Sequence, residues 1–233
     1  MTPTPTRAPD AIALLAQARA LRGVRLGDLA AELDVPEPTR LGAAKGWAGE
    51  LLERSLGASA GNDAEPDFPA LGVELKTIPL GPNGRPVEST WVTRVPLDPV
   101  GAGLAWSDSA VGRKLACVLW IPIEIDRAGP AHGRIGTPCL WRPDAAELAT
   151  LQSDYEDLMS MILLGHVDAI DARRGDALQI RPKGRDASST APAIGHDGRA
   201  ARTGSRGFYL RPSFTQLVLR RCLAAPGLSA PQG

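Results

Sequence analysis

The residues best suited to chemistry are two carboxylates and a lysine in the first third of the chain: Asp67, Glu74 and Lys76. Glu74 and Lys76 are two positions apart in a stretch where polar and apolar residues alternate. On a β-strand, residues i and i+2 point to the same face, so these two side chains should lie together while Val73 and Leu75 face a core. Asp67 precedes Glu74 by seven positions, which is close enough for the carboxylates to converge after a short turn.

These three residue types are the minimum that metal-dependent phosphodiester hydrolysis needs. Two hard carboxylate oxygens can hold Mg²⁺, and an adjacent lysine can orient or activate a water molecule beside the ion. The pattern taken alone is weak, because an acid followed by Glu-x-Lys is common by chance. An exposed strand face that carries an ion pair is the simpler interpretation of the triplet by itself.

The scarcity of lysine strengthens the catalytic interpretation. Of the 26 cationic residues, 22 are arginine and only four are lysine: Lys45, Lys76, Lys114 and Lys183. In a chain that uses arginine as its general cation, a remaining lysine indicates a position that needs a compact ammonium group with an adjustable pKa. Lys76 is one of the four.

The charges are unevenly distributed along the chain. The net charge is zero, which by itself does not favour a nucleic-acid partner. Residues 173–221, however, contain eleven Lys or Arg against three Asp, a balance of +8. This balance indicates a basic surface suited to a polyanion, and neutralisation by acidic neighbours in the fold explains it equally well.

Composition places the chain among globular proteins. Its 233 residues, 43% hydrophobic and 22% charged, suit one domain with one or two lobes. The three cysteines are far apart in the sequence, which predicts reduced, buried thiols. We expect no signal peptide and no membrane segment, and therefore a cytoplasmic protein. The three histidines lack metal-ligand spacing and should be exposed.

Hydrophobic periodicity and turn residues predict the elements. We expect helices over residues 10–23, 26–33, 47–56, 144–165 and 213–223. We expect extended segments or strands over residues 67–80, 87–95, 115–125, 177–182 and 208–211. The turn at 81–86 should return the chain as a hairpin, and 184–206 should be a mobile loop. This order predicts an α/β or α+β domain with a mixed central sheet, spanning residues 10–223 between a flexible N-terminus (1–9) and a flexible tail (224–233).

From residue 10 to residue 222 the chain resembles the MutH family, the nicking endonucleases of methyl-directed mismatch repair. The resemblance rests on these stretches: Lys45–Trp47, Leu51–Glu53, Leu56–Gly61, Asp67–Pro79, Val118–Pro122, Leu178–Lys183 and Arg206–Leu210. It implies a restriction-endonuclease-like fold, with a mixed central sheet flanked by helices and two lobes around a DNA cleft. The basic segment, about 173–223, would belong to the C-terminal lobe.

The resemblance also implies a role for each matching residue. Asp67 and Glu74 correspond to the metal-binding carboxylates, with the carbonyl oxygen of Leu75 as a third ligand. Lys76 corresponds to the lysine that positions the attacking water. The remaining catalytic residues would be Glu53, a further acid of the site, and Lys114, close to the scissile phosphate.

The implied DNA-binding residues are Lys45, Gly46, Trp91, Arg181, Lys183 and Tyr209. Tyr209 corresponds to the aromatic residue associated with sensing adenine methylation. The chain departs from the family at Trp91, where a smaller aromatic is expected, and at Ala116 and Cys117, which replace a basic pair. Every lysine of the chain falls on a position with an implied function.

The implied activity is strand-specific DNA cleavage with one or two Mg²⁺ ions. The family nicks the unmethylated strand of hemimethylated double-stranded DNA, 5′ to the G of a GATC site. MutL activates it after MutS has found a mismatch, and we expect a monomer with no membrane partner. Two alternatives remain: a restriction endonuclease of the same fold that cuts GATC sites without a partner, and a DNA-binding module without catalysis.

Overall fold

The computed structural model describes residues 8–38, 46–60, 64–183 and 190–224. The chain divides into two compact units. The first contains Met1–Glu88, Cys117–Arg142 and Gln216–Gly233, and the second contains Ser89–Ala116 and Pro143–Thr215. Within the described residues, no helix is long and apolar enough to span a bilayer.

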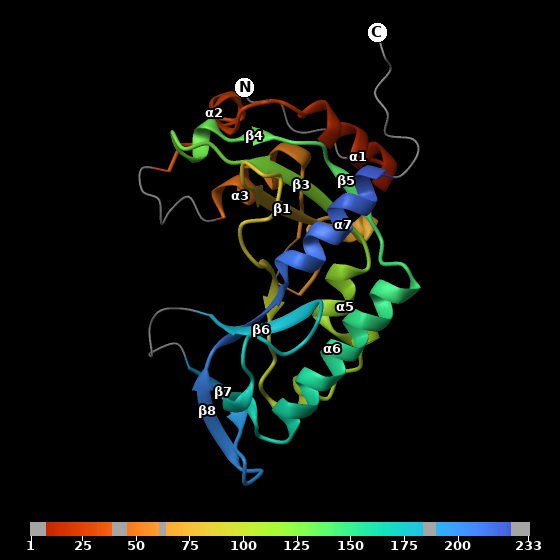
Figure 1. Ribbon diagram of the computed structural model, residues 1–233, viewed down its shortest axis with the longest axis vertical. Coiled ribbons are helices and arrows are strands. Elements are labelled where there is room, and N and C mark those ends of the chain that lie inside the picture. The colour runs from red at the N-terminus through yellow and green to blue at the C-terminus, as the bar shows by residue number, and fades with distance from the viewer. Residues whose placement is uncertain (1–7, 39–45, 61–63, 184–189, 225–233) are drawn as a thin grey trace. The chain divides into compact units, whose positions relative to one another are not determined.

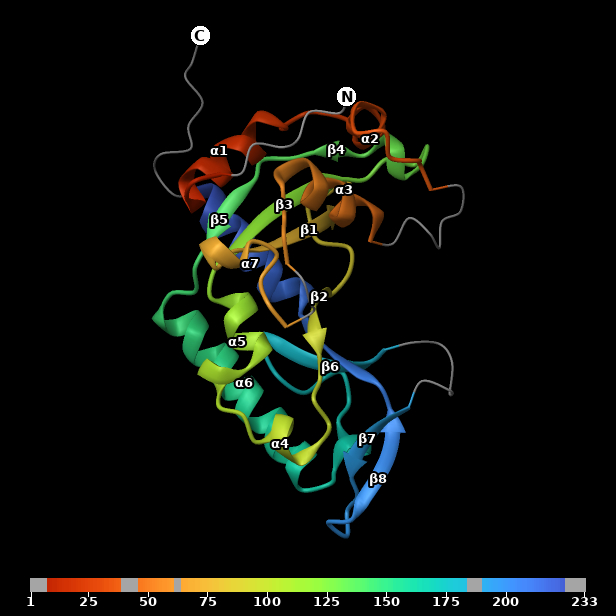
Figure 2. The same ribbon diagram turned by 180° about the vertical axis from the view of Figure 1, so that it is seen from behind.

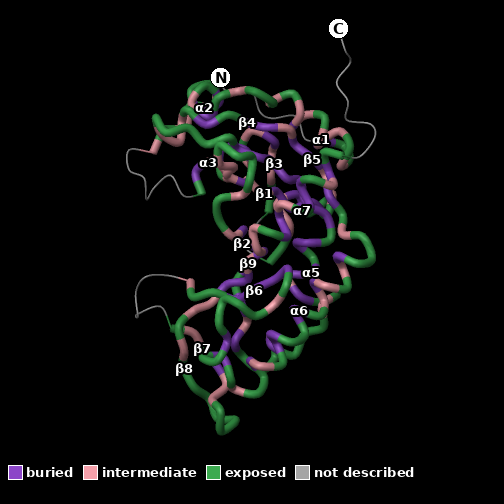
Figure 3. Tube along the Cα trace, viewed as in Figure 1, coloured by how far each residue is buried: buried purple, intermediate pink, exposed green. Residues whose placement is uncertain are grey.

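A mixed four-stranded sheet forms the centre of the first unit (Figure 1). Its strands are β1 (Glu74–Leu80), β3 (Val118–Glu124), β4 (Arg134–Ile135) and β5 (Cys139–Trp141). β1 and β3 run parallel, whereas β4 and β5 each pair antiparallel with β3. The first six residues of β3 are buried, as expected for a central strand with an uninterrupted apolar sequence (Figure 3).

Three helices of the first unit contribute to its core: α1 (Ala11–Ala20), α2 (Leu26–Glu32) and α3 (Trp47–Leu56). Asp10 caps α1, because its carboxylate accepts the backbone N–H groups of Ile12 and Ala13 at 2.9 and 2.8 Å. All three helices agree with the sequence prediction. Their apolar side chains pack with those of β1 and β3 in a core that includes Leu14, Leu29, Leu51, Leu52, Val73, Leu75, Leu119 and Ile121.

The second unit contains an antiparallel sheet in the order β2-β9-β6. The strands are β2 (Thr90–Arg94; seen from behind in Figure 2), β6 (Leu178–Pro182) and β9 (Arg206–Leu210). Its helices are α4 (Pro99–Ala102), α5 (Ala110–Leu115) and α6 (Ala145–Leu163). Asp144 and Glu147 form a capping box at the start of α6, and the α6 side chain of Tyr155 packs beside Phe208 with ring centroids 5.8 Å apart.

Helix α7 (Pro212–Ala224) contributes residues to both units, and the described residues also contain four short 3₁₀ helices. These are η1 (Pro69–Leu71), η2 (Trp106–Asp108), η3 (Pro130–His132) and η4 (Val167–Ala169). The cysteines at 117, 139 and 222 are buried and free, and the histidines at 132, 166 and 196 are exposed, as predicted. The mixed α/β class of the fold is confirmed.

The predicted hairpin of residues 67–95 is wrong. The turn at 81–86 forms, since Gly81 N–H donates to Arg85 O at 2.9 Å, and one antiparallel bridge joins Leu80 to Pro86. The pairing ends there, and β1 and β2 do not form a ladder with each other. β1 pairs with β3 and β2 pairs with β9. A parallel partner for β1 requires a long crossover, which here passes through the second unit before the chain returns to β3.

The predicted loop over 184–206 is also wrong for much of its length. β7 (Thr190–Ile194) and β8 (Ala200–Gly204) form an antiparallel hairpin. Its turn closes with a 2.8 Å bond from Gly195 N–H to Arg199 O, and Gly198 adopts a left-handed conformation with φ +75°. Most of these residues are at least partly exposed, so the hydrophobic alternation that predicts a strand is weak here.

Candidate active site and DNA-binding surface

A tight turn brings Asp67 beside Glu74. Phe68 and Val73 exchange backbone hydrogen bonds of 2.8 and 3.3 Å, as in one rung of an antiparallel ladder. Gly72 makes this possible with a left-handed backbone, φ +61°. The next pair in the same register is Asp67 and Glu74. The Asp67 carboxylate also accepts the N–H of Leu75 at 2.8 Å, which fixes it against the first residues of β1.

Glu74 and Lys76 lie on one face of β1 and form an ion pair. Glu74 is 1% exposed and the Lys76 side chain 13% exposed, so water screens this pair only weakly. Val73 and Leu75 point into the core of the first unit, as the alternating pattern predicts. The arrangement is therefore not the exposed ion pair of the simpler interpretation.

The backbone of Leu75 faces the edge of β1 opposite β3. The N–H of Glu74 donates to Cys117 O at 3.0 Å, so the backbone groups of Glu74 are directed toward β3. In a strand, the groups of the next residue point the opposite way, and the bond from Leu75 N–H to Asp67 confirms this direction. The carbonyl of Leu75 therefore lies on the same edge of β1 as the Asp67 carboxylate.

Glu53 of α3 adds a third carboxyl group to this region. Burial raises its pKa, and the negative charge of Asp67 raises it further, whereas the Lys76 ammonium opposes both and Glu74 adds to them. The helix lies against β1 at this point: a Cβ on Gly49 would be 3.8 Å from Glu53 Oε1 and 3.9 Å from Thr77 Oγ1. The start of β1 thus concentrates negative charge around one lysine.

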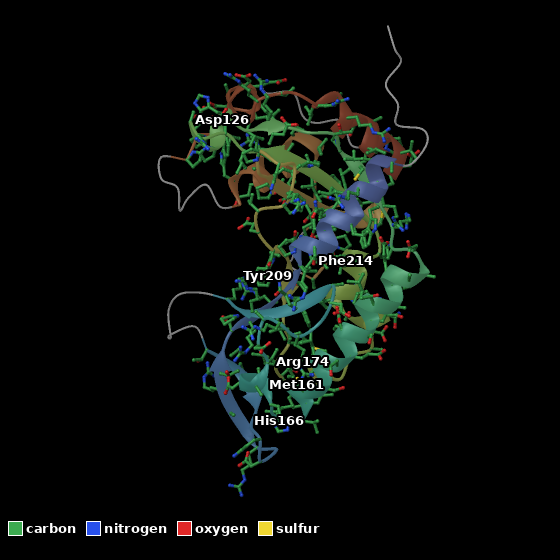
Figure 4. All side chains as sticks on the ribbon, in the orientation of Figure 1. Asp126, Met161, His166, Arg174, Tyr209 and Phe214 are labelled. Carbon is green, nitrogen blue, oxygen red and sulfur yellow. The ribbon has the colours of Figure 1, made fainter. Side chains whose placement is uncertain are left out.

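One face of the sheet in the second unit carries aromatic and cationic side chains. Tyr209 (labelled in Figure 4) lies between Trp91 and Gln179 in the strand register, so these three share a face. The rings of Trp91 and Tyr209 meet edge-on with centroids 5.2 Å apart. Arg181 lies 5.8 Å from the Tyr209 ring centroid and the Lys183 ammonium 4.0 Å from that of Trp91.

Gly207 makes room for the indole of Trp91 on this face. It lies opposite Arg181 in the register, and a Cβ at this position would overlap the Trp91 ring. Trp91 therefore covers a glycine of the neighbouring strand, an arrangement that stabilises a sheet where a glycine offers no side chain. Aromatic planes flanked by cations suit stacking and phosphate contacts with a nucleic acid.

Comparison with known proteins shows to which family the chain belongs. The family model "DNA mismatch repair enzyme MutH" matches residues 56–154. The DNA mismatch repair protein MutH of Shewanella woodyi is 48% identical over 209 residues, which cover 89% of this chain and 90% of that protein. The MutH proteins of Haemophilus influenzae and Salmonella paratyphi A are 47% and 49% identical, covering 90% and 95% of this chain and 94% and 96% of their own lengths.

The chain belongs to the MutH family. It is a DNA mismatch repair enzyme of the endonuclease class, and its mixed α/β fold is the restriction-endonuclease-like fold of that family. The predicted family, fold class and enzyme class are confirmed. The boundaries of the predicted domain and the cleft between its lobes stay predictions.

The structure brings together most of the residues that the MutH resemblance implied. Asp67, Glu74, Lys76, the Leu75 carbonyl and Glu53 gather at the start of β1. Lys114 lies on α5 in the second unit and is buried, and its contact with a scissile phosphate stays a prediction. The recognition set divides into Trp91, Arg181, Lys183 and Tyr209 on the second unit's sheet, and two residues before α3. Of these two, Gly46 caps α3 with φ +91°, and Lys45 lies outside the described residues.

The donors at β1 suit a small divalent cation. Among the described residues, no cluster of three or more His, Cys, Asp or Glu is placed to hold a metal ion. Two carboxylates and one backbone carbonyl are nevertheless hard oxygen donors, and Mg²⁺ takes few protein ligands and keeps several waters. A dication would also relieve the repulsion that contributes to the raised pKa of Glu53. The residues therefore suit a small divalent cation.

We call the face that carries Trp91, Tyr209, Arg181 and Lys183 the recognition face. Two further residues of it were not predicted from the sequence. Ser89 and Gln179 hydrogen-bond to each other, and Ser89 also accepts a bond from Arg181. A serine before a strand and a glutamine inside one carry no distinctive spacing. The adjacent Arg181 and Lys183 were the only signal near them.

Proposed function

We propose that this chain cleaves one phosphodiester bond in the unmethylated strand of hemimethylated duplex DNA, 5′ to the G of a GATC site. The observation that carries this proposal is the convergence of Asp67, Glu74 and Lys76 at the start of β1. A non-catalytic DNA-binding module has no need of a buried glutamate paired with a lysine beside a second carboxylate.

Asp67, Glu74 and the Leu75 carbonyl would hold one or two Mg²⁺ ions. A bound Mg²⁺ supplies Lewis acidity toward the phosphate and lowers the pKa of a coordinated water. Glu53 would be a further carboxyl group beside the cation. Burial and the negative charges of Asp67 and Glu74 raise its pKa, and a bound cation would favour its ionised form.

Lys76 orients the water that attacks phosphorus. Its ammonium pairs with Glu74, one of the two carboxylates that would hold the ion, and an ammonium has further N–H donors for a water. Lys114 supplies positive charge that offsets the charge developing on the phosphate oxygens. Both roles follow from the match of these positions to the MutH family.

Recognition of the DNA belongs to the second unit's sheet. Arg181 and Lys183 carry donors of the kind that bind guanine O6 and N7, or phosphate oxygens. Trp91 and Tyr209 provide the planar surface between them. Tyr209 distinguishes N6-methyladenine from adenine by a steric clash or by the loss of a hydrogen bond at N6.

The partners are those of mismatch repair. The relatives of this chain are DNA mismatch repair proteins, and this supports activation by MutL after MutS has found a mismatch. We place the chain in the cytoplasm as a monomer that acts on double-stranded DNA.

The test uses supercoiled plasmid with Mg²⁺ and with unmethylated, hemimethylated or fully methylated GATC sites, each with and without MutL. The expected product is the nicked circle from hemimethylated and unmethylated plasmid, formed faster with MutL and not formed by Glu74→Ala. Linear plasmid without MutL would instead identify an autonomous restriction endonuclease. Equal activity of Glu74→Ala and the wild type would refute the proposed site.

A further inference from the structure

Arg181 is exposed, but its guanidinium contacts two neighbouring side chains. Its Nη1 donates to Ser89 Oγ at 3.2 Å, and its guanidinium carbon lies 5.8 Å from the Tyr209 ring centroid. An unrestrained arginine side chain loses rotamer entropy when it binds. These two contacts reduce the number of conformations that the guanidinium samples before DNA binds.

Ser89 is itself fixed from the opposite direction. Its Oγ accepts a 2.8 Å hydrogen bond from Nε2 of Gln179, and Gln179 is only 4% exposed. A buried amide that bonds a hydroxyl fixes where that hydroxyl lies, because leaving the amide unpaired is costly. Gln179 and Arg181 are two residues apart on β6 and share a face, so one hydroxyl reaches both side chains.

We propose that Ser89 is a positioning residue for DNA recognition. The buried Gln179 amide holds the Ser89 hydroxyl in place, and that hydroxyl holds the guanidinium of Arg181. Ser89 accepts two hydrogen bonds, which uses both acceptor sites of its oxygen. The role requires a hydroxyl at position 89 and requires nothing of the rest of the side chain. The inference rests on the proposed DNA-binding role of Arg181.

The test is a double-mutant cycle on positions 89 and 181. The variants are Ser89→Ala, Arg181→Ala and the pair, with Ser89→Thr as the conservative variant. Ser160→Ala is the matched control, since Ser160 is an exposed serine on α6. Affinity for a short hemimethylated duplex with one GATC site is measured by fluorescence anisotropy without divalent metal, and single-turnover nicking is measured with Mg²⁺.

A positioning role predicts coupling between the two residues. Ser89→Ala should weaken binding of the GATC duplex about tenfold, the effect of one hydrogen bond to a charged group. In the Arg181→Ala background the same change should weaken it less than about twofold. Ser89→Thr should stay within about twofold of wild type because it keeps the hydroxyl.

Each contrary outcome identifies what has failed. If Ser89→Ala weakens binding equally in both backgrounds, Ser89 acts without Arg181 and the inference is refuted. If Ser89→Thr loses as much as Ser89→Ala, or if Ser89→Ala matches Ser160→Ala, the hydroxyl has no such role. If Arg181→Ala binds and nicks like wild type, the proposed DNA contact of Arg181 fails, and the inference fails with it.

Discussion

Replacing Asp154 with asparagine should destabilise the second unit strongly although Asp154 touches no proposed site residue. Asp154 lies on α6, is 8% exposed, and accepts the backbone N–H groups of three consecutive residues that lead into β6. The bonds are 2.9 Å from Asp176, 2.7 Å from Ala177 and 2.8 Å from Leu178. A carboxylate is an acceptor at both oxygens, whereas an amide is an acceptor at only one.

The magnitude follows from these three bonds. In Asp154→Asn, two N–H groups keep a neutral acceptor, and each bond loses about 1 kcal/mol because hydrogen bonds to charged groups are stronger. The N–H of Asp176 bonds both carboxylate oxygens, at 2.9 and 3.0 Å, so it loses one of its two bonds and meets the new NH₂ group, at a cost of about 2 kcal/mol. The sum is about 4 kcal/mol, which corresponds to a fall of roughly 10 °C in the melting temperature when the 233-residue chain unfolds as a whole.

Asp157→Asn is the matched control. Asp157 is one turn further along α6 and bonds Arg174 in the same connecting segment, at 2.8 Å, but both side chains are about half exposed. An exposed ion pair contributes about 0–1 kcal/mol, so this variant should melt within about 2 °C of wild type. Thermal and urea unfolding followed by circular dichroism provide the measurement. Similar midpoints for the two variants would refute the reasoning, because a purely electrostatic effect of the acidic helix does not distinguish these positions.

The other predictions concern the two proposed surfaces. Lys76→Ala should lower the single-turnover nicking rate on the order of 10³-fold while anisotropy shows unchanged DNA binding, and weakened binding would contradict a role confined to chemistry. Tyr209→Phe should change the ratio of nicking rates on hemimethylated and unmethylated plasmid more than the rate on unmethylated plasmid alone, and equal loss on both would refute methylation sensing. Glu53→Gln should be more stable than wild type at pH 7 in EDTA, and no more stable near pH 4. The pKa of Glu53 is raised above its usual 4.5, so the folded state binds its proton more tightly and loses stability as the pH rises. Urea midpoints across this pH range test it, and a gap that persists at pH 4 would show that the charge of Glu53 is not the cause.

Local signals in the sequence predicted the helices and the central strand. The start of α6 could be predicted because Pro143 precedes an amphipathic run. β3 was readable because a strand buried on both faces needs an uninterrupted apolar sequence. The triplet of Asp67, Glu74 and Lys76 was readable because strand alternation and a short turn are also local.

Strand pairing was not readable, since it depends on residues far apart in the chain. The turn at 81–86 has every local feature of a hairpin, yet β1 pairs with β3 about forty residues later in the register of Glu74 with Val118. Nothing near the turn indicates that a parallel partner competes. The role of Ser89 could not be predicted for the same reason. Ser89 contacts Gln179 and Arg181, which are distant in the sequence and come close only because β9 pairs with both β2 and β6.

β1 and β2 lie in different sheets, so the proposed catalytic residues and the proposed recognition residues do as well. Glu74 and Lys76 of β1 belong to the first unit, whereas Trp91 of β2 belongs to the second, although the two strands are consecutive in the sequence. Each group of residues is fixed by hydrogen bonds within its own unit: Asp67 to Leu75 in one, and Gln179 to Ser89 in the other. A substitution in either set therefore perturbs its own unit first. Variants of β1 should lose cleavage while they still bind DNA, and variants of the recognition face should lose sequence and methylation discrimination while they retain the carboxylate geometry that performs hydrolysis.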